Sequence, residues 1–194
     1  MIESSGATSD AFHGMGREDI DVRCLGEGRP FVAELKSPLR RTFDLEELTS
    51  SINKAAENQI EIHSLRLSNR AEVSRIKETK AEKSYTIRFT SDHGLTDEEV
   101  SARIQSLSGQ VLEQQTPQRV AHRRADKIRN RKVISIENIL IEDGEIQFDV
   151  RCESGTYVKE LVHSDEGRTN PSVAALLETD CKVVLLDVKD IHAD

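Results

Sequence analysis

The chain has 194 residues and a net charge of −8, with 36% hydrophobic and 32% charged residues. This composition predicts a folded globular protein with a sizeable core rather than a disordered chain. Because no apolar run approaches the roughly 20 residues that cross a bilayer, we expect no membrane-spanning helix. The three cysteines are scattered and form no CxxC pair, which indicates reduced thiols in a cytoplasmic protein and no structural zinc site.

The first part of the chain predicts a leader, a hairpin and a helix. Residues 1–11 lack the features of a signal peptide and predict a short flexible leader. Alternation over 20–24, the turn sequence GEGRP and a second strand over 31–35 predict a hairpin, with Asp19 where loop becomes strand. Asp44 is a suitable N-cap for an amphipathic helix over 45–56.

The rest of the chain alternates irregularly between strand and helix patterns. Period-2 alternation predicts strands at 60–67, 84–91, 111–115, 132–142, 145–152 and 182–188. Helical patterns occupy 71–80, 96–107, 155–163 and the sequence NPSVAALLET. Hairpin signals without a regular βαβ repeat favour an α+β fold on a largely antiparallel sheet, as a single domain over 12–194.

The charge is distributed unevenly. Residues 119–132 (RVAHRRADKIRNRK) contain seven Arg or Lys against one Asp and carry +6, which leaves −14 on the rest of the chain. This segment is either a patch that faces phosphates or a solvated helix face.

Two further residues have both a structural and a functional interpretation. Lys159 falls in the first turn of the helix expected over 155–163, where an anionic partner would explain a cation; otherwise it extends into water. Tyr85 lies in a predicted strand, as a core residue or as a platform on which an unstacked base stacks.

Three acids lie close together near the start of the chain, at Glu18, Asp19 and Asp21. Clustered carboxylates can hold a divalent metal, as in nucleases. Arg17 and Arg23 flank them and would compete with a metal ion, so we expect no metal site. Nucleotide-binding, serine-hydrolase and zincin motifs are absent from the sequence.

Three segments together resemble one family. GREDIDVR (16–23) resembles the catalytic motif of pseudouridine synthases, in particular the archaeal and eukaryotic branch that modifies the T loop of tRNA. SGTYVKELVHSDEGRTNPSV (154–173) and TPQRVAHRRADKIRNRKV (116–133) are similar to two further segments of that branch, in the same order.

The resemblance implies the pseudouridine synthase fold, a mostly antiparallel mixed sheet flanked by helices with a central active-site cleft. It implies isomerisation of uridine to pseudouridine at tRNA positions 54 and 55, without metal or organic cofactor. The partner is then the T arm of tRNA. Longer members carry an N-terminal RNA-binding region of the THUMP type that has no counterpart here, so a missing region or a separate RNA-binding partner is expected.

The same resemblance assigns roles to individual residues. Asp19 matches the catalytic aspartate, Lys159 the basic residue that pairs with it, and Tyr85 the active-site tyrosine. Val158 matches the aliphatic residue that packs against the base, and Arg17 could reach a phosphate or fill the gap left by the flipped nucleotide. The basic segment would hold the tRNA backbone through Arg119, His122, Arg123, Arg124, Lys127 and Arg129.

Two other functions stay open from the sequence. One is a tRNA-binding remnant without catalysis, because no RNA-binding region of the THUMP type is recognised. The other is a metal-dependent nuclease that uses Glu18, Asp19 and Asp21.

Overall fold

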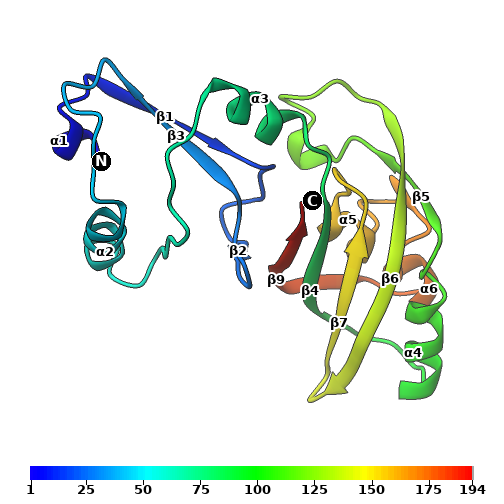
Figure 1. Ribbon diagram of the computed structural model, residues 1–194. Coiled ribbons are helices and arrows are strands. Elements are labelled where there is room, and N and C mark those ends of the chain that lie inside the picture. Colours follow the sequence, from blue (N-terminus) through cyan, green and yellow to red (C-terminus); the bar gives the residue numbers. More distant parts are fainter. Residues whose placement is uncertain (194) are drawn as a thin grey trace. The chain divides into compact units, whose positions relative to one another are not determined.

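The computed structural model describes residues 1–193, and these form two compact units (Figure 1). The first consists of residues 1–17 and 29–79, and the second of residues 18–28 and the chain from residue 80 onward. That both units form one catalytic domain over 12–194 stays a prediction. No helix in the described part of the chain is long and apolar enough to cross a membrane.

The first unit is a two-stranded sheet with three helices. It contains α1 (Ile2–Ser5), β1 (Ser9–Gly14), β3 (Phe31–Lys36), α2 (Leu45–Ala55) and α3 (Arg70–Glu78). Residues 1–11, expected as a flexible leader, instead hold α1 and the start of β1, and Ser5 and Ala7 are buried.

Two predictions for this unit were wrong. The segment 31–35 does not pair with 20–24, because β3 pairs antiparallel with β1, where the rings of Phe12 and Phe31 stack 5.2 Å apart. The strand expected over 60–67 does not form. Asn53 on α2 holds this segment in an irregular path instead, since its side chain donates to the Ile62 carbonyl and accepts from the Ile62 amide, both at 2.8 Å.

The second unit is built on a seven-stranded sheet in the order β2-β9-β4-β7-β6-β5-β8. Neighbouring strands run antiparallel except β2 and β9, which are parallel. The strands are β2 (Arg23–Cys24), β4 (Glu82–Ser91), β5 (Val111–Gln115), β6 (Ile128–Glu142), β7 (Glu145–Cys152), β8 (Thr169–Asn170) and β9 (Cys181–His192). The prediction of an α+β fold on a mostly antiparallel mixed sheet is confirmed.

Helices cover one side of this sheet (Figure 1). They are α4 (Asp97–Gln105), α5 (Val158–His163) and α6 (Val173–Leu177), with a short 3-10 helix, η1, over Gln118–Val120. Helix α4 lies within the helical pattern over 96–107, and Thr96 and Glu99 form a capping box at its start. Helix α5 begins three residues later than expected.

The core follows the two-residue alternation of β4. Every second residue from Lys83 to Phe89 is buried, and Phe89 meets Phe148 of β7 edge to face at 6.1 Å. Because successive side chains of a strand point to opposite faces, Lys83 and Tyr85 share this inner face with Ile87 and Phe89. A lysine and a tyrosine are thereby placed at the end of the apolar core.

Candidate active site

The acidic segment is held beside the last strand. Residues 18–22 form a loop, and β2 follows it with Arg23 opposite Asp187 of β9. The Arg23 guanidinium pairs with both oxygens of the Asp187 carboxylate, and the Leu25 amide donates to the Val188 carbonyl at 2.8 Å. The hairpin prediction fails here because β2 pairs with β9, 164 residues further along the chain, and not with its sequence neighbour.

Asp19 lies between two cations. Nη1 of Arg119 donates to its carboxylate at 2.8 Å to Oδ1 and 2.7 Å to Oδ2, and Nζ of Lys159 lies 3.7 Å from Oδ2. The Asp19 side chain is 29% exposed. This partly exposed carboxylate is held by two cations and stays within reach of a substrate.

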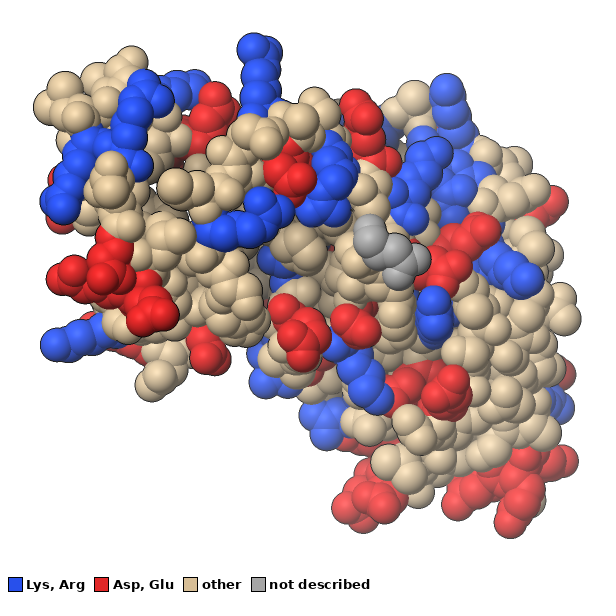
Figure 2. Space-filling view, viewed as in Figure 1, with Lys and Arg blue, Asp and Glu red and all other residues tan. Residues whose placement is uncertain are grey.

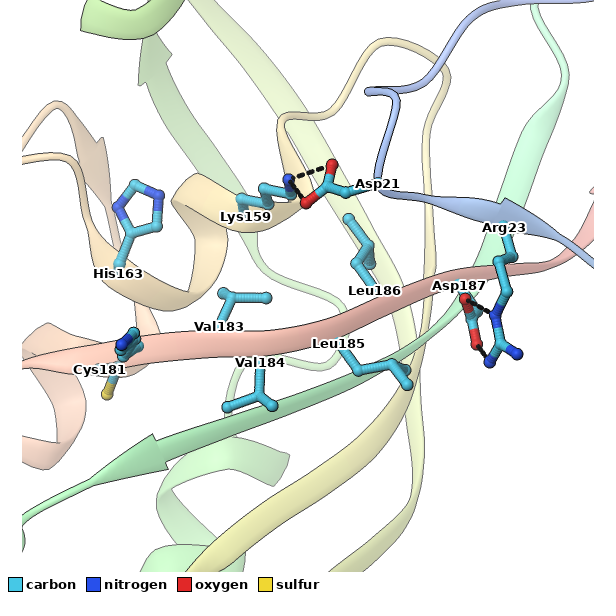
Figure 3. Close-up of a pocket in the computed structure, with 11 residues that line it drawn as sticks. Asp21, Arg23, Lys159, His163, Cys181, Val183, Val184, Leu185, Leu186 and Asp187 are labelled. Carbon is cyan, nitrogen blue, oxygen red and sulfur yellow. Dashed lines mark hydrogen bonds and ion pairs between the residues drawn. The ribbon is translucent and has the colours of Figure 1, made fainter.

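Lys159 contacts the second acid more closely than the first. Its Nζ donates to both oxygens of Asp21, at 2.8 and 2.7 Å (Figure 3). This hydrogen bond holds the pKa of Asp21 below its ordinary value. Lys159 is the second residue of α5, so the first turn of this helix carries the cation that links both acids.

Glu18 has its own cation. Its carboxylate accepts from Nζ of Lys83 at 2.5 Å, and both side chains are close to fully buried. Lys83 lies on β4 two residues before Tyr85, so this ion pair ties the acidic loop to the strand that carries the tyrosine. Glu18, Asp19 and Asp21 thus each pair with a cation, and no group of three His, Cys, Asp or Glu among residues 1–193 could hold a metal ion.

Tyr85 and Val158 are both buried, with 6% and 5% of their surfaces exposed. Tyr85 stands opposite Val150 of β7 and Val188 of β9, at a register shift between β4 and β9. Val158 is the first residue of α5, next to Lys159. Their expected role as walls around a flipped base stays a prediction.

The basic segment is not a helix. It runs through η1, an irregular loop over 121–127 and the first residues of β6. His122, Arg123, Arg124 and Lys127 are exposed on this loop. Figure 2 shows blue side chains gathered at the upper end of the sheet unit, and red ones at its lower end near the β6–β7 turn. The solvated-helix interpretation was therefore wrong for this segment.

Two of the predicted binding residues have inward partners. Arg119 points its guanidinium at Asp19 and Glu160. Arg129 donates to Thr116 Oγ1 at 2.8 Å and so holds the base of the loop. Arg17 is exposed in the first unit, and its expected role stays a prediction.

A pocket of about 480 Å³ opens beside the Asp21–Lys159 pair. Residues 181–187 of β9 line it, together with Arg23 and with His163 of α5 (Figure 3). Its side chains combine an apolar floor with charged groups at the rim.

Two residues of the cluster escaped the sequence analysis, Lys83 and Glu160. Lys83 occupies an inward position in the alternation of β4, and a lysine at such a position signals a buried partner. Glu160 precedes the buried pair Leu161 and Val162, and a carboxylate within a short buried helix is the corresponding signal.

Solved structures share this fold. The archaeal box H/ACA sRNP Nop10–Cbf5 complex superposes with a TM-score of 0.51 and 17% identity, over 94% of this chain and 39% of that chain. A Cbf5–Nop10–Gar1 complex gives 0.50 and 21%, over 76% and 45%. The chain has the pseudouridine synthase fold, as the sequence predicts.

Sequence comparison narrows this class to one family. The family model described as "Pus10, C-terminal" matches residues 1–192. The tRNA pseudouridine synthase Pus10 of Methanothrix thermoacetophila is 44% identical over 191 residues, and that of Methanocaldococcus jannaschii 40% over 192. The chain belongs to the Pus10 family, and it spans 42% of the length of these two relatives while they match 98% and 99% of it.

Proposed function

We propose that this chain is the catalytic part of a tRNA pseudouridine synthase that acts on the T-loop uridines at positions 54 and 55. The observation that carries the proposal is the Asp19 carboxylate between Arg119 and Lys159, in a chain whose relatives are named tRNA pseudouridine synthases. Because the chain spans less than half of those relatives, the activity of the whole protein is part of the proposal.

The chemistry is an internal rearrangement. The bond between C1′ and N1 breaks, the detached base turns, and C5 joins C1′; C5 loses a proton and N1 gains one. The reaction therefore needs no oxidant or reductant, and the uracil that leaves C1′ is the group that rejoins it. If the Asp19 carboxylate attacks C1′, uracil leaves and a C1′–carboxylate ester forms, which C5 of the turned base then displaces to free Asp19. If Asp19 instead removes the proton from C2′ as uracil leaves, it returns that proton to C2′ once C5 has joined C1′. Arg119 and Lys159 hold the Asp19 carboxylate in either role.

The substrate base must leave its stack before it reacts. Unstacking costs a few kcal/mol, and apolar and aromatic walls in the pocket offset this cost. We assign that role to Tyr85 and Val158, which lie on the strand and helix that also carry Lys83 and Lys159. The exposed cations of the loop over 121–127 bind the tRNA backbone.

We also propose where the enzyme acts and what it needs to bind its RNA. It acts in the cytoplasm on tRNA, without a metal. Its RNA-binding region is either supplied by further chain, as the length of the relatives suggests, or by a separate partner.

The test is to incubate the wild-type chain with a T-arm transcript and to map pseudouridine chemically, with and without EDTA. We expect pseudouridine at positions 54 and 55, unchanged by EDTA. Salt-sensitive binding without isomerisation would instead identify a non-catalytic tRNA-binding remnant. Strand cleavage that EDTA abolishes would identify a metal-dependent nuclease.

A further inference from the structure

Glu160 carries a charge in the interior of the sheet unit. Its side chain is 1% exposed, and both of its carboxylate oxygens accept from Arg119, from Nε at 2.6 Å and from Nη2 at 3.3 Å. A buried carboxylate is tolerated only when it is paired, and Arg119 supplies the partner that Glu160 needs in this interior position.

The same guanidinium contacts Asp19 with its remaining terminal nitrogen. Nη1 lies 2.8 Å from Oδ1 and 2.7 Å from Oδ2 of Asp19. A guanidinium is planar and rigid, so a carboxylate that fixes the edge between Nε and Nη2 also fixes where Nη1 points. A lysine at this position could not contact both carboxylates in this way.

We infer that Glu160 is a positioning residue for Asp19, acting through Arg119. The inference rests on the proposed function, because it treats Asp19 as the reacting carboxylate. Glu160 fixes the direction from which Arg119 meets Asp19, and its negative charge offsets part of the positive field of Arg119. Arg119 can then orient the Asp19 carboxylate without fully neutralising it.

The electrostatics of Arg119 agree with this arrangement. Burial alone would lower the pKa of the guanidinium, but the hydrogen bonds and charges of Glu160 and Asp19 raise it above its ordinary value. The two carboxylates thereby favour the cationic form of Arg119 at this partly buried position.

A purely structural role for Glu160 gives a different expectation. In that case the pair only ties η1 to α5, and loss of Glu160 loosens both elements, so that RNA binding weakens together with the rate. A positioning role predicts that Glu160 affects the rate only while Arg119 is present and leaves the Kd for the RNA unchanged. A double-mutant cycle read together with the Kd separates the two roles.

The experiment measures single-turnover rate constants of pseudouridine formation, with T-arm RNA and saturating protein. It compares wild type, Glu160→Gln, Arg119→Gln and the double variant. We expect each single variant to lose about 10- to 100-fold, because a displaced reacting group costs rates of this order. The rate constant of the double variant should lie within about threefold of that of Arg119→Gln. The Kd for the RNA should change less than about twofold in Glu160→Gln, since Glu160 is buried and is not one of the exposed cations that bind the backbone.

Glu145→Gln is the matched control, because it removes a carboxylate that pairs with Arg88 at 3.1 Å at the far end of the β6–β7 hairpin. Arg119→Lys guards against a folding defect in Glu160→Gln, since the Arg119 side chain is 37% exposed. Arg119→Lys keeps the positive charge, but its rate constant should fall by the same factor as that of Arg119→Gln.

A wild-type rate in Glu160→Gln or Arg119→Lys, or multiplicative losses in the double variant, would overturn the inference while the proposed function stands. A wild type without activity would overturn both.

Discussion

Asp19 and Asp21 are two residues apart in the sequence, yet they differ in their partners. Asp19 receives its closest hydrogen bonds from Arg119, whereas Lys159 donates to both carboxylate oxygens of Asp21. Asp21 is also the more exposed, at 64% against 29%. Lys159 therefore contacts Asp21 closely and lies 3.7 Å from Asp19, so the close contacts of Asp19 come from Arg119.

The pKa of Asp21 gives a prediction for titration. The Lys159 hydrogen bond lowers the pKa of Asp21 below 3.8 in the folded chain. A carboxyl group whose pKa is lower in the folded chain than in the unfolded chain stabilises the fold at pH values above the unfolded pKa. This stabilisation is lost as the pH falls through the folded pKa. The difference in Tm between wild type and Asp21→Asn should therefore shrink as the pH is lowered from about 6 to about 3. Calorimetry at several pH values measures it, and a difference that grows towards low pH would refute the assignment.

At the scale of elements, β2 decides where the acids lie. Among the described strands, this two-residue strand pairs with β9 and with no other. Gly26, just after it, has φ +60°, and a Cβ there would overlap the carbonyl oxygen of Lys189. The close approach of the chain to β9 thus requires a glycine.

Gly26→Ala should displace β2 and the acidic loop from β9. We expect a loss of about 1–3 kcal/mol in the free energy of unfolding, from strain and overlap together, and a slower isomerisation. Gly144→Ala is the control, since Gly144 has a similar φ of +78° but open space around it, and should cost about 1 kcal/mol without effect on the rate. Denaturant unfolding and rate measurements on both variants give the comparison. Equal rates in the two would show that β2 does not position the acids.

Most elements of the sheet unit were predictable because their signals are local. The capping box of α4 and the alternation of β4 and β7 specify those elements without distant partners. The pairing of β2 with β9 and of β1 with β3 was not predictable, because neither pair is formed by neighbours in the sequence.

The candidate site was predictable in part for the same reason. Asp19 and Lys159 were found through motifs that match a known family. The side-chain contacts of Arg119 depend on Glu160, and those of Glu18 on Lys83, so they appear only when distant segments meet. A run of cations in the sequence shows net charge, but it does not show which of them turns inward.

On the scale of the whole molecule, charge is divided between the two ends of the sheet unit. Exposed cations occupy the loop over 121–127, and exposed acids lie at the β6–β7 turn, where residues 142 and 143 are both acidic (Figure 2). A net-acidic protein can bind a polyanion when its positive charge is local, and its acidic end disfavours other orientations.

Replacing Arg123 and Lys127 with Gln should weaken tRNA binding and make it less sensitive to salt. The slope of log K against log salt is negative, and each lost phosphate contact makes it shallower by about 0.7–0.9. Filter binding at several salt concentrations measures the slope. Lys54→Gln, an exposed position on α2, should leave it unchanged. A slope that stays at the wild-type value in the double variant would place the tRNA contact elsewhere.

The most direct test of the account compares the two neighbouring acids. Single-turnover rates of pseudouridine formation at positions 54 and 55 are measured for Asp19→Asn and Asp21→Asn, with melting curves to confirm folding. We predict that Asp19→Asn loses at least about 10³-fold in rate, as expected when the reacting carboxylate is removed. Asp21→Asn should stay within about tenfold of wild type, because it removes a partner of Lys159 and not the reacting group. Activity retained in Asp19→Asn and lost in Asp21→Asn would contradict the account.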